Sequence, residues 1–181
     1  MADTLVFIHG LESTSQGNKG RYFREHFPQM IILDYPGDFA ARMRKLNDVL
    51  RGRKALVLVG SSYGGLMAAC FARENAERVK KLILLAPALT LEEFASAAAR
   101  PLTIPVVIYH GTKDDIVDPQ AVKAIAEKSF SCLEHHLVED DHPLSNVFPT
   151  LPWLELLARR ADFCKDPRGP AVQKTDHPER H

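Results

Sequence analysis

Short apolar runs alternate with stretches of helical periodicity along most of the chain. Six of these runs have the length and composition of strands: residues 5–9, 30–34, 55–61, 81–86, 106–111 and 133–138. Their Leu, Ile and Val residues follow one another without polar alternation, which is typical of strands covered on both faces and therefore of a parallel sheet. Helices are expected on both sides of that sheet.

The segments between the runs carry helix signals. Apolar side chains recur at helical spacing over residues 39–50, with Asp38 placed to cap the start. Asp118 and Pro119 supply a cap and a first-turn proline for a later helix, and an apolar face over 153–161 predicts the last one. Because strand and helix alternate throughout, the predicted fold class is α/β, a doubly wound three-layer sandwich around a parallel sheet of six strands.

Composition limits the kinds of partner. The 181 residues fit a single domain, expected over 1–164, with a flexible tail over 165–181 where three prolines stand among polar residues. Lys and Arg number 23, as do Asp and Glu, so bulk charge indicates neither a nucleic-acid partner nor a membrane surface. The three widely spaced cysteines favour reduced thiols. Without a basic leader or an apolar run of roughly 18 residues, a cytoplasmic location is expected.

The most specific motif is G-x-S-x-G over residues 60–64, directly after the third apolar run and before a helical stretch. Its glycines allow a tight, strained turn in which strand and helix pass close together while the central hydroxyl is held above the sheet edge. Ser62 is therefore the candidate nucleophile.

A nucleophilic serine needs a histidine to take its proton and a carboxylate to orient that histidine. His142 directly follows the last apolar run, and Pro143 biases it toward extended loop backbone. Three aspartates follow the fifth run. Asp118 is explained as a helix cap, and Asp114, nearest the strand end, is preferred over Asp115 as the orienting carboxylate.

The oxyanion that forms during acyl transfer needs backbone N–H donors. The residue after the nucleophile, Tyr63, supplies one. The loop after the first strand is expected to supply the other from Leu11, because Gly10 permits close backbone approach. A plain strand-ending turn is the alternative explanation of this glycine.

Four segments in chain order carry a resemblance to a known family: His9-Gly10-Leu11, Gly60-Ser61-Ser62-Tyr63-Gly64, His110-Gly111-Thr112-Lys113-Asp114 and Asp141-His142. They match the oxyanion, elbow, acid and histidine segments of the α/β-hydrolase superfamily, which the chain resembles over residues 4–163. Among its branches, small lidless serine esterases of the YqiA-like and RBBP9-like kind look most similar. Two departures are that the usual first two strands are absent, which implies a reduced sheet, and that the cap position leaves room for one short helix.

The predicted function is a serine hydrolase that cleaves small soluble carboxylic esters through an acyl-enzyme on Ser62. A minimal cap implies an open acyl site, for which Leu89, Phe94 and Leu144 are candidate lining residues, although ordinary packing explains them equally well. Without a P-loop or a G-x-G-x-x-G motif, no cofactor or metal is expected. A thioesterase or amidase with the same residues, or a non-catalytic binding protein, are the alternatives. The pattern gives no indication of the oligomeric state.

Overall fold

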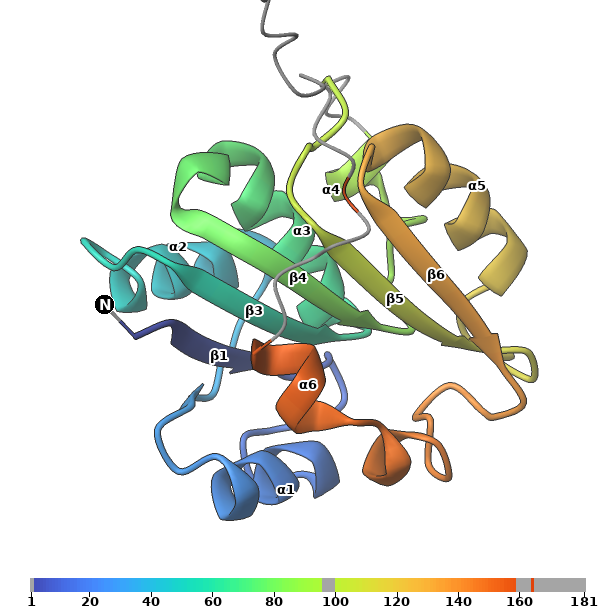
Figure 1. Cartoon of the computed structure of the whole chain (residues 1–181), viewed down its shortest axis with the longest axis horizontal. Helices are drawn as coiled ribbons and strands as arrows, with labels where there is room; N and C mark the ends of the chain where they lie inside the picture. The colour runs from blue at the N-terminus through green and yellow to red at the C-terminus, as the bar shows by residue number, and fades with distance from the viewer. Residues whose placement is uncertain (1, 96–99, 159–163, 165–181) are drawn as a thin grey trace, which may run out of the picture.

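A parallel sheet forms the centre of the computed structural model, which describes residues 2–95, 100–158 and 164 (Figure 1). Within these ranges the sheet has six strands in the order β2-β1-β3-β4-β5-β6. Their bounds are β1 Thr4–Ile8, β2 Ile31–Ile32, β3 Leu56–Ser61, β4 Val79–Leu85, β5 Val106–Gly111 and β6 Leu133–Val138. Every neighbouring pair is parallel. The predicted fold class is therefore confirmed, including the six-stranded sheet.

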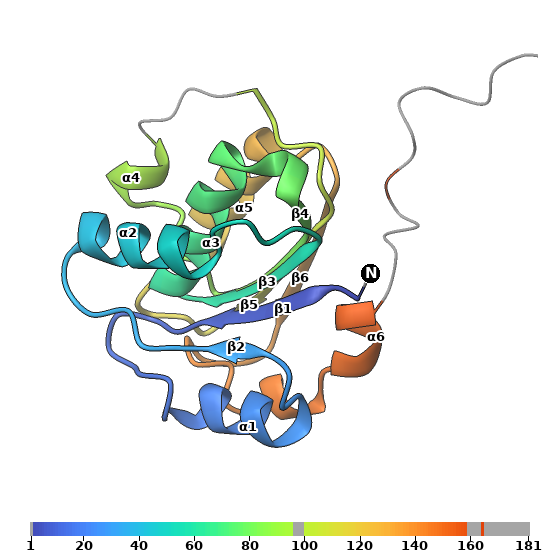
Figure 2. The ribbon, with the colours of Figure 1, turned by 90° about the vertical axis from the view of Figure 1, so that its left-hand side faces the viewer.

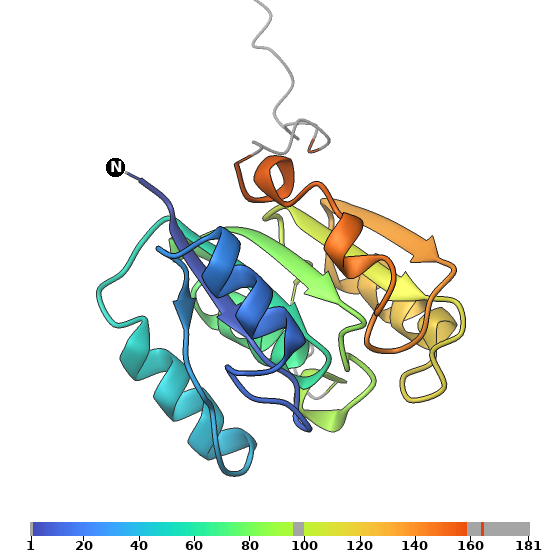
Figure 3. The ribbon, with the colours of Figure 1, turned by 90° about the horizontal axis from the view of Figure 1, so that it is seen from below.

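Helices cover both faces of the sheet (Figure 2). One face carries α1 (Asn18–His26) and α6 (Trp153–Ala158), which lie in front of the sheet in Figure 3. The other carries α2 (Phe39–Val49), α3 (Tyr63–Glu74), α4 (Glu92–Ala95) and α5 (Pro119–Ser129). Short 3₁₀ turns are η1 (Ala76–Arg78) and η2 (Phe148–Thr150). None of the helices in the described ranges has the length and hydropathy that spanning a lipid bilayer requires.

Two buried clusters, one on each side of the sheet, form the core. The larger contains Leu46 of α2, Leu66 of α3 and Val122 of α5, whereas the smaller contains Phe23 of α1 and Trp153 of α6. In β1 and β3, alternate residues enter opposite clusters, which explains their continuous apolar runs.

The predicted caps are confirmed. The Asp38 carboxylate accepts from the N–H of Ala41 at 2.8 Å, and the Asp118 carboxylate accepts from the N–H of Gln120 at 2.9 Å. Each bond satisfies an N–H group that has no partner inside its own helix.

The last helix departs from its prediction. Trp153 and Leu157 are buried as expected, but the Leu154 side chain is 76% exposed, so the apolar face is narrower than the sequence indicates. The end of the predicted helix, including Ala161, and the predicted tail over 165–181 lie outside the described residues.

The cysteines also depart from expectation. Cys132 and Cys164 form a disulfide, with their Cα atoms 5.2 Å apart. The expectation of three reduced thiols is therefore wrong for this pair, because the fold places Cys164 beside Cys132, directly before β6, which sequence spacing does not reveal. Cys70 is a buried free thiol, and burial raises its pKa to about 11.

Candidate active site

The predicted nucleophile lies at the turn between β3 and α3. Ser62 has φ 53° and ψ −115°, and residues other than glycine rarely adopt a positive φ. Neighbouring backbone enforces it: the Ser62 N–H donates to Leu85 O at 2.8 Å, and the Ser62 carbonyl accepts from Gly65 N at 2.9 Å and Ala88 N at 3.1 Å. Backbone strain held in this way is a frequent property of reactive residues.

The motif glycines are required by close packing of backbone. A Cβ atom on Gly64 would overlap the carbonyl oxygens of Ile8 and His9, at the end of β1. A Cβ on Gly60 would overlap the Gly64 backbone. The two glycines therefore bring β1, β3 and the first turn of α3 together around Ser62.

Ser62, His142 and Asp114 form a chain of hydrogen bonds. His142 Nε2 lies 2.9 Å from Ser62 Oγ, and His142 Nδ1 lies 2.7 Å from Asp114 Oδ2. Because a carboxylate only accepts, Nδ1 carries the proton of the neutral ring, and Nε2 accepts from the serine hydroxyl. The Asp114 side chain is fully buried, whereas the His142 side chain is 17% exposed. The three residues follow different strands and meet at the carboxyl edge of the sheet.

The Asp114 carboxylate accepts four hydrogen bonds. Its Oδ1 accepts from the backbone N–H groups of Ile116 and Val117 at 2.9 and 2.8 Å. Its Oδ2 lies 2.7 Å from His142 Nδ1 and 2.9 Å from His110 Nε2. Burial alone would raise the pKa of Asp114, but the hydrogen bonds from Val117, His142 and Ile116 outweigh it and hold the pKa below its usual range. Asp114 is thus charged at neutral pH.

The other two aspartates of this segment are placed differently. Asp115 is exposed, and Asp118 caps α5. Of the three carboxylates that the sequence offered, the structure brings Asp114 to His142.

A second buried carboxylate, Asp140, organises the loop that carries His142. It accepts from the N–H groups of Asp141, Asn146 and Val147 at 2.7–2.9 Å, and from the Asn146 side-chain amide at 3.1 Å. Burial would raise the pKa of Asp140, but the bonds from Val147, Asp141 and Asn146 outweigh it and lower the pKa. Sequence reasoning missed this residue, because nothing in an Asp-Asp-His run tells which carboxylate faces inward.

Lys19 connects the same loop to α1. Its ammonium group donates to the Pro143 carbonyl and lies 5.3 Å from the centre of the Phe148 ring. Burial lowers the pKa of Lys19, against the opposing charges of Asp141 and Asp140. The peptide between Pro143 and Leu144, one residue beyond His142, is therefore held to α1.

His9 fixes the loop at which the second oxyanion donor is predicted. Its Nε2 accepts from the Tyr35 N–H at 3.1 Å, so its Nδ1 carries the proton and donates to the Gly10 carbonyl at 2.7 Å. A Cβ on Gly10 would lie 3.4 Å from Ser62 Cβ, which places this loop beside the serine. Within the described part of the chain, neither the Leu11 N–H nor the Tyr63 N–H donates to another protein group.

The three predicted pocket residues lie in the core. Leu89 and Phe94 belong to the larger buried cluster and Leu144 to the smaller, all with at most 1% of their surface exposed. The packing explanation therefore fits the structure better than a role in contacting substrate. Apolar residues that follow buried strands are drawn into the same core as the strands themselves.

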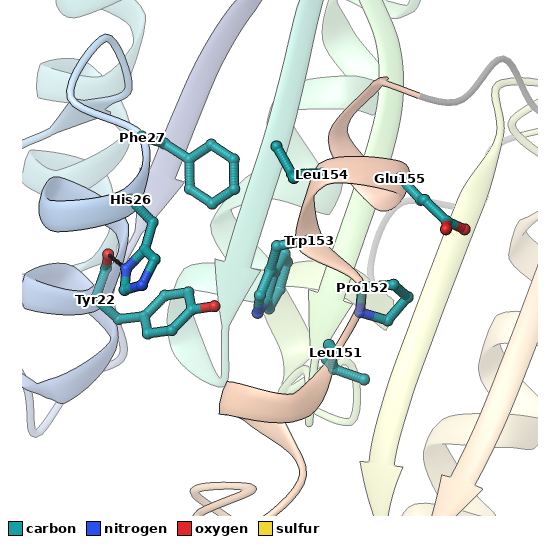
Figure 4. Close-up of a pocket in the computed structure, with 8 residues that line it drawn as sticks. All are labelled: Tyr22, His26, Phe27, Leu151, Pro152, Trp153, Leu154 and Glu155. Carbon is teal, nitrogen blue, oxygen red and sulfur yellow. Dashed lines mark hydrogen bonds between the residues drawn. The ribbon is translucent and has the colours of Figure 1, made fainter.

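A pocket of about 390 Å³ lies between α1 and α6 (Figure 4). Tyr22 and His26 stack at one side with ring centres 4.1 Å apart, and Trp153 faces them. Its lining contains none of Ser62, Asp114 and His142. Among the described residues, no group of three His, Cys, Asp or Glu side chains is arranged to hold a metal ion.

Comparisons with known proteins agree with this architecture. A family model described as alpha/beta hydrolase fold matches residues 12–101. No curated protein matches the chain in sequence. Alpha/beta hydrolase domain-containing protein 10 from mouse is 21% identical, with a TM-score of 0.68 and coverage of 85% of this chain and 90% of that one.

Two bacterial structures are similar to the same degree. An alpha-beta serine hydrolase homologue from Coxiella burnetii is 20% identical, with a TM-score of 0.70, over 84% of this chain and 83% of that one. Est1E from Butyrivibrio proteoclasticus is 17% identical, with a TM-score of 0.66, over 87% and 89%. The narrower resemblance to YqiA-like and RBBP9-like esterases stays a prediction. The family match and the structural similarity show that the chain has the α/β-hydrolase fold.

Proposed function

We propose that the protein is a serine hydrolase that cleaves small, soluble carboxylic esters through an acyl-enzyme on Ser62. The observation that carries the proposal is the hydrogen-bond chain from Ser62 through His142 to Asp114, with distances of 2.9 and 2.7 Å. A hydroxyl is a weak nucleophile at neutral pH, and this arrangement supplies the base and the group that orients the base.

In the proposed reaction, Ser62 Oγ attacks the ester carbonyl while His142 Nε2 takes the hydroxyl proton. The imidazolium that forms is stabilised by the charged Asp114, which also keeps the ring in the required tautomer. His142 then gives the proton to the leaving alcohol, and the acyl group remains on Ser62. A water molecule, deprotonated by His142, releases the acid and restores the serine.

The negative charge on the carbonyl oxygen would be held by the N–H groups of Leu11 and Tyr63. Tyr63 follows Ser62 in the chain, and Leu11 follows Gly10, which lies beside Ser62 in space. Neither N–H group donates to another described group. The His9 side chain supports this role because it holds the Gly10 carbonyl, and with it the peptide plane that contains the Leu11 N–H.

A small substrate is favoured by the short connection between β4 and β5. The described part of this connection contains α4, a helix of four residues, and α4 packs into the core through Phe94. Two of the structurally similar proteins are named a monoacylglycerol lipase and an esterase, which agrees with ester chemistry on this fold.

Hydrolysis of p-nitrophenyl esters from acetyl to octanoyl tests the proposal and reads the depth of the acyl site. We expect turnover that is fastest with the short acyl groups, and labelling of the protein by a fluorophosphonate. Ser62→Ala should abolish labelling and lower kcat by at least about 10³-fold. Ser61→Ala, which removes a neighbouring hydroxyl, serves as the matched control. Absence of both turnover and labelling in the folded wild-type protein would refute the proposal. Faster cleavage of matched thioesters than of esters would favour the thioesterase alternative instead.

A further inference from the structure

We infer that His110 is a positioning residue, a neutral imidazole that keeps a permanent N–H donor on the same Asp114 oxygen that His142 uses. The inference rests on the proposed function, since it concerns how the orienting carboxylate is held. His110 thus becomes the fourth side chain in the series of hydrogen bonds that runs from Ser62 through His142 to Asp114.

The geometry fixes which ring nitrogen of His110 carries the proton. Nε2 lies 2.9 Å from Asp114 Oδ2 and 3.1 Å from the Val117 carbonyl oxygen. Both neighbours are acceptors only, so Nε2 must be the donor. The side chains of His110 and Asp114 are both fully buried, so water does not compete for this contact.

The other nitrogen shows that the ring is neutral. His110 Nδ1 is buried, and it has no hydrogen-bond partner among the described residues. Protonation would place an unpaired N–H and a positive charge in the core, which is more costly than an unpaired acceptor. Burial accordingly lowers the pKa of His110, and it outweighs the raising effects of the Asp114 charge and of the bonds to Asp114 and Val117.

Two other titratable rings lie near His110, those of His135 and His142. From β6, His135 faces the same side of the sheet, and both of its ring nitrogens are buried without partners in the described structure. Burial lowers the pKa of His135, as does the charge of Lys123 on α5, while Glu127 on α5 opposes them. His142, the remaining titratable neighbour, lies across Asp114 and also lowers the pKa of His110.

This arrangement has three consequences for the site. Each carboxylate oxygen accepts two hydrogen bonds, so the group cannot turn without breaking at least one of them. Because His110 stays neutral, it does not compete for the proton that His142 takes from the serine. Its N–H also withdraws charge from Oδ2, so without it the carboxylate would hold the protonated form of His142 more strongly.

Two substitutions separate the donor from the space that the ring fills. His110→Met keeps a side chain of similar bulk without a donor, whereas His110→Gln places an amide N–H near the position of Nε2. We would measure kcat and KM for p-nitrophenyl acetate between about pH 5 and about pH 9, where the acidic limb reports the catalytic histidine. Thermal unfolding would establish that both variants are folded.

For His110→Met we expect kcat to fall roughly tenfold with KM within about twofold, and the midpoint of the acidic limb to move to higher pH. His110→Gln should restore kcat to within about threefold of wild type and return the midpoint. Equal losses in both variants with an unmoved midpoint, or full activity in His110→Met, would overturn the inference. Inactivity of the wild-type protein would instead refute the proposed function.

A spectroscopic measurement on the wild-type protein needs neither turnover nor a variant. Nitrogen-15 labelling of the histidines distinguishes the two neutral tautomers and the charged ring. We expect His110 to remain the neutral Nε2–H tautomer from about pH 5.5 to about pH 8.5. An Nδ1–H tautomer, or a ring that titrates in this range, would overturn the inference.

Discussion

Replacing Asp114 with asparagine tests the proposed site most directly, because asparagine keeps the shape of the carboxylate and changes one oxygen into an N–H₂ group. Asp114 receives backbone N–H donors on Oδ1 and imidazole N–H donors on Oδ2. The amide can satisfy one of these sides with its oxygen. Its nitrogen must face the donors of the other side.

The structure determines which side the amide nitrogen faces. The backbone N–H groups of Ile116 and Val117 cannot become acceptors, whereas the His142 ring can change its tautomer. The amide oxygen is therefore expected to stay with the backbone, and the amide nitrogen to donate to His142 Nδ1. The proton of His142 then sits on Nε2, facing Ser62, where the ring can no longer act as a base.

This reasoning predicts a large loss of activity with a small loss of stability. We expect kcat to fall by about 10⁴-fold, the effect that the wrong histidine tautomer has in serine proteases. His110 keeps its Val117 acceptor at 3.1 Å, so the unfolding free energy should drop by about 1–3 kcal/mol, the cost of one imperfectly paired buried group.

The assay is steady-state hydrolysis of p-nitrophenyl acetate, with urea unfolding of the same samples. Asp115→Asn is the matched control, since it makes the same chemical change on the adjacent, exposed residue. Retention of more than about 1% of kcat in Asp114→Asn would refute the tautomer argument. An equal loss in the Asp115 variant would refute the choice of carboxylate.

Three further predictions concern the surroundings of the site. A Cβ on Gly111 would overlap the Asp140 carbonyl, so Gly111→Ala should lower the thermal midpoint and the activity together, at a cost of about 1–3 kcal/mol in thermal unfolding experiments. The pKa values of Asp114 and Asp140 are lowered in the folded state, so the two carboxylates stabilise the fold above the ordinary aspartate pKa, and this stabilisation is lost as the pH falls. Urea unfolding should therefore show that the free energy of unfolding decreases below about pH 4. Lys19→Met removes the bond to the Pro143 carbonyl and should lower kcat a few-fold, measurable in the esterase assay against unchanged fluorophosphonate labelling.

The strand pattern was predictable because burial on both faces leaves a direct mark on composition. All six runs match their strands to within two residues at each end, but β2 is reduced from five predicted residues to Ile31–Ile32. Only these two residues pair with β1 at the edge of the sheet, and an apolar run cannot tell how long an edge strand stays paired. The exposed Leu154 is a similar case, since helical spacing does not indicate where a neighbouring layer ends.

The positions of Ser62, Asp114 and His142 relative to the predicted strands indicated these three residues. The side chains that hold them in place could not be identified from the sequence. His9, His110 and Asp140 are buried polar residues whose partners are backbone atoms or side chains from other segments. A sequence lists such donors and acceptors without saying which ones face each other. The choice between neighbouring aspartates had the same difficulty, and it was decided by which carboxylate the loop turns inward.

The contact between Ser62 and His142 joins two separately packed parts of the molecule. Ser62 is anchored through α3 to the larger cluster, whereas the segment after His142 packs on α1 through Phe148 and Trp153.

Asp114 links the two parts at the edge of the sheet, because it reaches His142 from the loop after β5. Lys19 holds the loop that carries His142 to α1, within the part that contains the smaller cluster. The geometry of the reactive pair therefore depends on how these layers are held together, so substitutions in the smaller cluster can change activity without touching any reactive group.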